Sequence, residues 1–134
     1  MHRFLLDTNI LSYTQKKRPP AVLARFEKLQ PGEAVMSVIS LGEMVYGASR
    51  SARKVDLLTQ LEHLRRFLQV APLPEAAAEA YGAIRAELEH RGRLIGNNDL
   101  WIAAHAVASS LTLVTNNEKE FARIDGLAIE NWVS

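Results

Sequence analysis

Short apolar runs of strand length alternate with longer segments of helical periodicity along the chain, and this alternation limits its fold more than any other feature. We expect strands at residues 3–6, 34–36, 70–71, 111–115 and 127–129. Apolar residues at helical spacing predict helices near 8–17, 20–29, 37–48 (starting at Ser37 or at Ser40), 57–68, 75–91 and 99–110. Strands that alternate with helices favour an α/β fold, with a central parallel sheet and helices on both faces. At 134 residues the chain is expected to form a single domain, 1–134.

The helix near 37–48 carries both a candidate core stripe and a lone acid. Its core stripe is expected to contain Leu41, Met44, Val45 and Ala48. Glu43 lies roughly opposite that stripe, which by itself predicts a solvated position. The rest of its face is apolar or glycine and carries no other charge, which favours the wall of a cleft.

Composition excludes several functional classes. The chain has no cysteine, so disulfide scaffolds, thiolate metal sites and cysteine nucleophiles are excluded. Its net charge of +1 is too balanced for a protein that coats nucleic acid through charge alone. The apolar run at residues 4–6 is too short for a secretory signal, and the run at 100–108 is too short to span a membrane. We therefore expect a soluble cytoplasmic protein.

Three acids stand alone in stretches that contain no other formal charge. Asp7 is the only charged residue in 4–15, Glu43 in 34–49, and Asp99 in 94–117. A buried carboxylate without a partner is costly, so it is protonated, paired or bound to a cation. Taken singly, Asp7 and Asp99 each have a structural alternative, because both fall where an acid favours the start of a helix.

Three carboxylates that converge would form an all-oxygen site for a hard cation. Mg²⁺ or Mn²⁺ would offset their repulsion and keep them ionised at neutral pH. Sites of this kind support the hydrolysis of phosphodiesters. Asp7 follows a predicted strand directly, and ligands bind at the carboxyl ends of the strands in open parallel sheets.

Four ordered segments resemble the motifs of PIN-domain ribonucleases, in particular VapC-type toxins of toxin–antitoxin pairs. They are the segments 5–9 (LLDTN), 40–47 (SLGEMVYG), 92–106 (GRLIGNNDLWIAAHA) and 113–117 (LVTNN), followed by residues 120–132. A single Asp-Thr-Asn after a strand is weak evidence. The ordered set, which covers nearly the whole chain, is specific.

The resemblance implies a PIN fold with an acidic pocket at the strand ends, formed by Asp7, Glu43 and Asp99. We expect Asp7 and Asp99 to hold Mg²⁺ (or Mn²⁺) directly. Glu43 would act as a further ligand, directly or through water, or would orient the attacking water. The resemblance also implies cleavage of RNA such as tRNA, inhibition by a VapB-type antitoxin, and a homodimer that joins the antitoxin in a larger complex.

One position departs from the family pattern. Many PIN domains have a fourth acid where this chain has Asn117. An amide oxygen can still hold a cation or its water, but it adds no charge. Glu120 either compensates for the missing acid or is simply exposed, and Thr115 is a further supporting candidate.

Other polar residues have both functional and structural interpretations. His105 and Trp101 are more typical of packing than of base catalysis or base stacking. Basic side chains flank the acid-bearing segments and would position RNA through its phosphates. They are Lys16, Lys17, Arg18, Arg50, Arg53, Lys54, Arg91 and Arg93.

Two other classes of function compete with the nuclease. The first is an inactive PIN scaffold that binds RNA or protein, which the Asn117 departure favours. The second is a phosphoryl acceptor with Asp7 as nucleophile. That reading expects a second acid two residues after the first, where this chain has Asn9.

Overall fold

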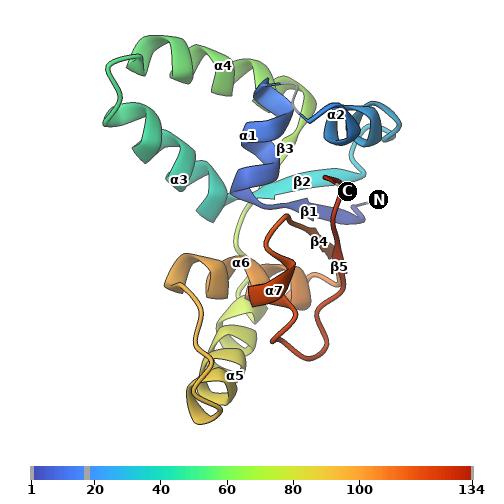
Figure 1. Ribbon diagram of the computed structural model, residues 1–134, viewed down its shortest axis with the longest axis vertical. Helices are drawn as coiled ribbons and strands as arrows, with labels where there is room; N and C mark the ends of the chain where they lie inside the picture. The colour runs from blue at the N-terminus through green and yellow to red at the C-terminus, as the bar shows by residue number, and fades with distance from the viewer. Residues whose placement is uncertain (1, 17–18, 134) are drawn as a thin grey trace.

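The structure is a computed structural model that describes residues 2–16 and 19–133. Helices and strands alternate as the sequence predicts, and their bounds follow in chain order (Figure 1). They are β1 Phe4–Leu6, α1 Thr8–Lys16, α2 Pro20–Glu27, β2 Ala34–Ser37, α3 Val38–Ser49, α4 Lys54–Phe67, β3 Gln69–Ala71, α5 Ala76–His90, α6 Asn97–Ala108, β4 Thr112–Val114, α7 Glu118–Phe121 and β5 Ile129–Glu130.

The strands form one parallel sheet in the order β3-β2-β1-β4-β5. β1 lies at the centre, where Leu5 pairs with Val35 on one side and with Leu113 on the other. The chain therefore builds the sheet outward from β1 in one direction and later returns to build the other half. The predicted fold class is confirmed.

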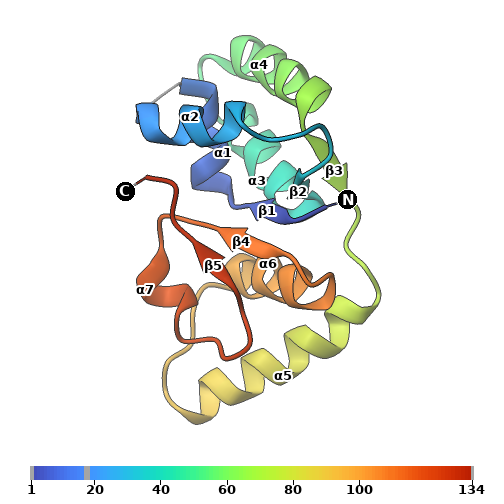
Figure 2. The same cartoon turned by 90° about the vertical axis from the view of Figure 1, so that its right-hand side faces the viewer.

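Helices cover both faces of the sheet and make three layers (Figure 2). Phe4 and Leu6 face the layer of α1, α2 and α4, whereas Leu5 faces the layer of α5, α6 and α7. Because successive strand residues point to opposite faces, each short strand contributes to both cores. These central strand residues are at most 4% exposed, which is why their sequence reads as continuous apolar runs.

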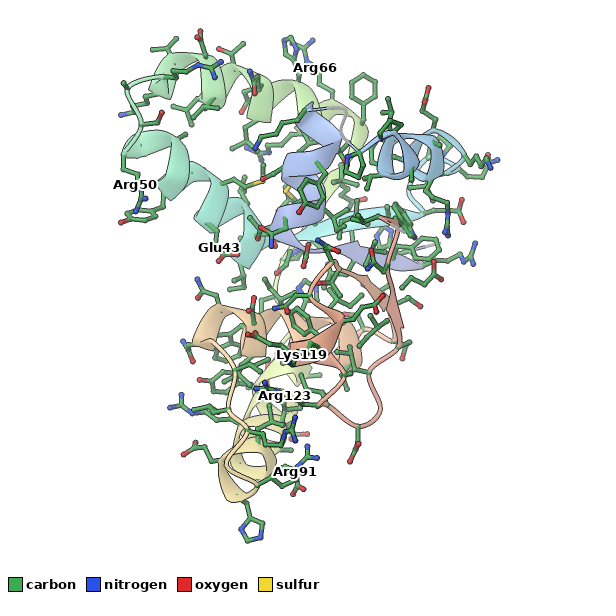
Figure 3. The ribbon with its side chains drawn as sticks, in the orientation of Figure 1. Glu43, Arg50, Arg66, Arg91, Lys119 and Arg123 are labelled. Carbon is green, nitrogen blue, oxygen red and sulfur yellow. The ribbon has the colours of Figure 1, made fainter. Side chains whose placement is uncertain are left out.

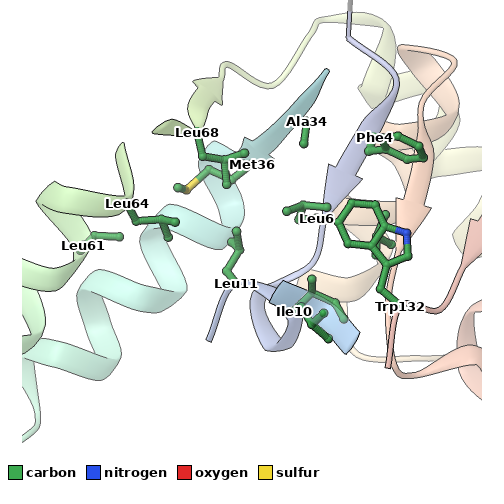
Figure 4. Packing of buried hydrophobic residues seen from close by; sticks show 12 residues of the cluster. Phe4, Leu6, Ile10, Leu11, Ala34, Met36, Leu61, Leu64, Leu68 and Trp132 are labelled. Carbon is green, nitrogen blue, oxygen red and sulfur yellow. The ribbon is translucent and has the colours of Figure 1, made fainter. Parts of the chain in front are cut away.

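Near the end of the chain, Trp132 packs into the core that contains Phe4 and Leu6 (Figure 4). Its indole is 1% exposed and packs edge to face on Phe4, with 5.4 Å between the ring centroids. The indole Nε1 donates to Glu130 at 3.0 Å, and the guanidinium of Arg25 lies over the ring. The last residues described thus complete the packing of the first strand.

The structure differs from the sequence expectations at several boundaries. Val45, expected in the core, is 40% exposed because it lies at the edge of the α3 stripe, while α4 packs over the side that carries Met44 and Ala48. α6 begins at Asn97 rather than at Asp99, and the last strand is Ile129–Glu130 rather than 127–129. α7 was not expected from the sequence, because only Phe121 anchors it in the core.

None of the helices within the described residues combines the length and the apolar character needed to span a bilayer.

We predict that Trp132→Ala destabilises the chain by about 3–5 kcal/mol, because it removes a fully buried indole from a packed core. Urea unfolding followed by circular dichroism measures the free energy of unfolding. Phe67→Ala is the matched control, since Phe67 is 76% exposed and its loss should change that free energy little. Equal stability of the Trp132→Ala variant and the wild type would contradict this account of the core.

Candidate active site

The central strands end side by side and place two polar residues together. Asp7 follows β1 and Thr115 follows β4, and the backbone N–H of Asp7 donates to the carbonyl of Val114 at 3.0 Å. The strand order reverses between β1 and β4, and such switch points at the carboxyl ends of strands are where open α/β sheets bind ligands.

Asp7 is held through both of its carboxylate oxygens. Oδ1 accepts from the backbone N–H of Ile10 at 2.9 Å, and Oδ2 accepts from the Thr115 hydroxyl at 2.6 Å. Asp7 therefore caps α1 and also faces the site, so the structural and functional interpretations both apply. Burial raises the pKa of Asp7 above its ordinary value, although these two hydrogen bonds oppose the shift.

Glu43 projects from α3 toward the same place and is half-buried. The Thr8 hydroxyl donates to its Oε1 at 2.5 Å, and the Asn98 side-chain amide donates to its Oε2 at 3.3 Å. Glu43 also lines two hollows in the surface, of about 290 and 550 Å³. The cleft-wall interpretation of its helix face is confirmed.

Asp99 lies in the first turn of α6, where the charges of the other acids act on it. Burial, followed by the charges of Glu43, Glu120 and Asp7, raises its pKa to about 6. Carboxylates that repel one another in this way lie close together. Among the described residues, none of the ion pairs includes any of these four acids.

Glu120 belongs to this acidic cluster and comes from α7. Its side chain is half-buried, and its Oε2 accepts from the Asn117 amide at 3.0 Å. Asn117 also donates its backbone N–H to the Thr115 hydroxyl at 2.9 Å. The interpretation of Glu120 as simply exposed is therefore wrong, and Asn117 serves to hold Glu120 and Thr115.

The chemistry of the cluster suits a hard cation, because all its side-chain donors are oxygens and their charges are otherwise uncompensated. The acids do not form a closed cage, since no three Asp, Glu or His side chains of the described residues have the geometry of a metal site. Mg²⁺ does not need one: it keeps several waters and takes one or two carboxylates from a protein.

Two polar residues near the acids were missed by the sequence reasoning as contributors to the site. They are Thr8 and Asn98, the two donors to Glu43. Each is the chain neighbour of one of the acids, Asp7 or Asp99, and lies inside segment 5–9 or 92–106 of the family resemblance, which was the signal that pointed to them.

The predicted basic residues are spread widely (Figure 3). Lys16 is near the acids and lines the smaller hollow beside Glu43. Arg50 lies at the far end of α3 and Arg91 at the far end of α5, on opposite sides of Glu43 in this view. The others are Arg53, 3.9 Å from Asp56; Lys54 and Arg93, both exposed; and Lys17 and Arg18, which lie outside the described residues.

His105 and Trp101 occupy packing positions. His105 is 1% exposed, its Nδ1 lies 2.9 Å from the Ser37 hydroxyl, and burial lowers its pKa. Trp101 stacks on Tyr81 with 3.8 Å between the ring centroids. Both contacts agree with the structural interpretations made from the sequence.

Residues 4–127 match the family model of the PIN domain. Ribonuclease VapC2 of Rickettsia felis is 42% identical over 130 residues, covering 96% of this chain and 97% of the relative. The tRNA(fMet)-specific endonuclease VapC of Shigella flexneri is 41% identical over 132 residues, covering 98% and 99%.

Solved structures show the same relationship. VapBC2 from Rickettsia felis, bound to a DNA fragment from its promoter, matches with a TM-score of 0.90 and 41% identity over 96% of this chain and 98% of that chain. DNA-bound VapBC from Salmonella typhimurium matches with a TM-score of 0.92 and 39% identity over 98% and 99%. Together with the acids gathered at the ends of β1 and β4, these full-length matches establish that the chain belongs to the PIN-domain family and, within it, to the VapC ribonucleases.

Proposed function

We propose that this chain is a cytoplasmic, metal-dependent endoribonuclease that acts as the toxin of a toxin–antitoxin pair. The observation that carries the proposal is the cluster of four carboxylates, without a described basic partner, at the switch point of a parallel sheet. The names of the VapC relatives supply the substrate class, which is RNA, and the tRNA(fMet)-specific relative makes a structured tRNA the first substrate to test.

Asp7 and Asp99 would hold the cation, Mg²⁺ or Mn²⁺. When bound, the cation supplies positive charge to the phosphodiester and lowers the pKa of a water. Asp7 is already fixed for this role by the Thr115 hydroxyl and by its capping bond to Ile10. Asp99 lies half-buried in the first turn of α6.

Glu43 would orient the attacking water and accept its proton. It lines the groove from which RNA would approach. Glu120 adds the negative charge that Asn117 lacks, so the departure from the family pattern does not leave the site short of an acid. This weakens the case for an inactive scaffold.

We predict that the purified chain cleaves tRNA(fMet) in the presence of Mg²⁺ and that Asp7→Asn slows cleavage by on the order of 100-fold or more. The substitution keeps the shape of Asp7 and removes its charge. Cleavage is followed on gels with and without EDTA. Equal cleavage by the wild type and Asp7→Asn would refute the metal-nuclease assignment, and calorimetry that detects no Mg²⁺ binding would favour the inactive scaffold.

The raised pKa of Asp99 predicts how stability depends on pH in the metal-free chain. Folding raises this pKa, so protonation favours the folded state; the gain is complete below pH 4 and is lost as the pH rises through about 6. In EDTA at pH 7.5, Asp99→Asn should therefore be more stable than the wild type by about 1 kcal/mol, after allowance for solvent screening. The difference should shrink toward pH 4.

Mg²⁺ should reverse this order at pH 7.5, because it stabilises the wild type through binding to the folded state. Thermal unfolding with EDTA and with Mg²⁺ measures both effects. A wild type that is unchanged by Mg²⁺ and no less stable than Asp99→Asn would contradict the role given to this carboxylate.

We also propose that a VapB-type antitoxin inhibits the chain, which matches chains of solved VapBC complexes. An apolar hollow of about 320 Å³ lies between α1, α2 and α4 and is lined by Leu23, Phe26, Leu64 and Phe67. A helix of the antitoxin would fill it, and a basic segment would reach the acids by charge-assisted hydrogen bonds. The homodimer expected from the resemblance stays a proposal; exposed Val38, Val45 and Tyr46 are apolar side chains that it would cover.

We predict that Phe67→Glu weakens binding of a VapB-type antitoxin encoded beside the chain by about 100-fold, because it places a charge in an apolar hollow. RNA cleavage by the free chain should change less than twofold. Val55→Glu is the matched control, since Val55 is equally exposed on α4 and lines neither hollow that contains Phe67. Affinity is measured by calorimetry, and wild-type affinity in Phe67→Glu would rule out this groove.

A further inference from the structure

Glu43 is fixed by hydrogen bonds rather than by packing. Gly42 precedes it and Gly47 lies one helical turn later, and a Cβ added at either glycine would meet no atom within 4 Å. The groove on this side of α3 has a volume of about 550 Å³. A glutamate has three side-chain torsions, so in such open space nothing but its hydrogen bonds selects one orientation of the carboxylate.

Its two donors are neutral, and each engages a different oxygen. The Thr8 hydroxyl binds Oε1 and the Asn98 amide binds Oε2. Glu43 is thereby oriented without losing its charge to a basic partner. A lysine or arginine in either place would instead pair with the carboxylate and lower its basicity.

Both donors are chain neighbours of the proposed metal ligands. Thr8 directly follows Asp7 at the start of α1, and Asn98 directly precedes Asp99 in the first turn of α6. The same two helix starts that present Asp7 and Asp99 therefore also clamp Glu43, which comes from α3. This clamp therefore sets where the Glu43 carboxylate lies relative to Asp7 and Asp99.

We propose that Thr8 and Asn98 are positioning residues that act through Glu43, holding its carboxylate toward the water that attacks RNA. The inference rests on the proposed function and adds two residues to which the sequence analysis assigned no role. Catalysis is sensitive to such placement, and loss of a residue that orients a metal-site side chain typically costs 10–100-fold in activity or metal affinity.

The test compares Thr8→Val, Thr8→Ser, Asn98→Ala and the double variant Thr8→Val with Asn98→Ala. Steady-state cleavage of tRNA(fMet) gives kcat and KM at saturating Mg²⁺, and calorimetry with Mg²⁺ alone gives its Kd. Asn97→Ala is the matched control, because Asn97 lies in the same turn of α6 but bonds to Tyr81 rather than to Glu43. Thermal unfolding shows that each variant is folded.

We expect Thr8→Val and Asn98→Ala each to lower kcat about 10-fold while KM and the Mg²⁺ Kd stay within about twofold. Thr8→Ser should keep near wild-type kcat because it keeps the hydroxyl. In a Glu43→Ala background, neither substitution should slow cleavage further, since both act through that carboxylate.

Different failures have different meanings. Unchanged kcat in Thr8→Val and Asn98→Ala, or an equal loss in Asn97→Ala, would overturn the positioning role and leave the nuclease intact. A loss of Mg²⁺ affinity that matches the loss of kcat would also overturn it, because the residues would then act on the metal ligands. Wild-type protein whose cleavage is insensitive to EDTA and to Asp7→Asn would overturn the proposed function and this role together.

Discussion

Mutual repulsion among four carboxylates is the constraint on which the rest of this structure depends. Asp7, Glu43, Asp99 and Glu120 come from four separate segments, and burial, followed by the charges of the other three acids, raises the pKa of Asp99 to about 6. The protein does not neutralise them with its own described basic groups. Neutral donors hold Asp7, Glu43 and Glu120 instead, which preserves their charge for a cation. The uncompensated charges are expected to leave the metal-free chain less stable than it would be without them.

The sheet makes this arrangement possible. β1 is paired on both sides, and its residues contribute to two separate cores, so the position at which Asp7 leaves the sheet is rigid. The apolar side chains buried in the two cores stabilise the fold and lie away from the acidic end of the sheet. Their burial can therefore offset the cost of holding unpaired carboxylates at that end. Trp132 strengthens one of these cores from the far end of the sequence.

The acidic site and the apolar groove share one helix. α1 begins directly after Asp7, carries Thr8 against Glu43, and presents Thr14 to the hollow formed with α2 and α4. A partner seated in that hollow would lie against the element that organises the acids. One bound chain could therefore fill the hollow and also place a cationic side chain in the acidic site.

The sequence by itself determined the order of strands and helices, the parallel fold class, and the three acids that lack local partners, because apolar periodicity and isolated charge are both local signals. It also identified Asn117 as a departure from the motif. Only the tertiary structure decided that Glu120 joins the cluster, that Val45 lies outside the core, and that Thr8 and Asn98 hold Glu43. The partners of Glu43 come from segments more than thirty residues away, the exposure of Val45 depends on how α4 packs on α3, and Glu120 comes from a helix too short and polar to show a pattern. A carboxylate's partners are fixed only when distant elements meet.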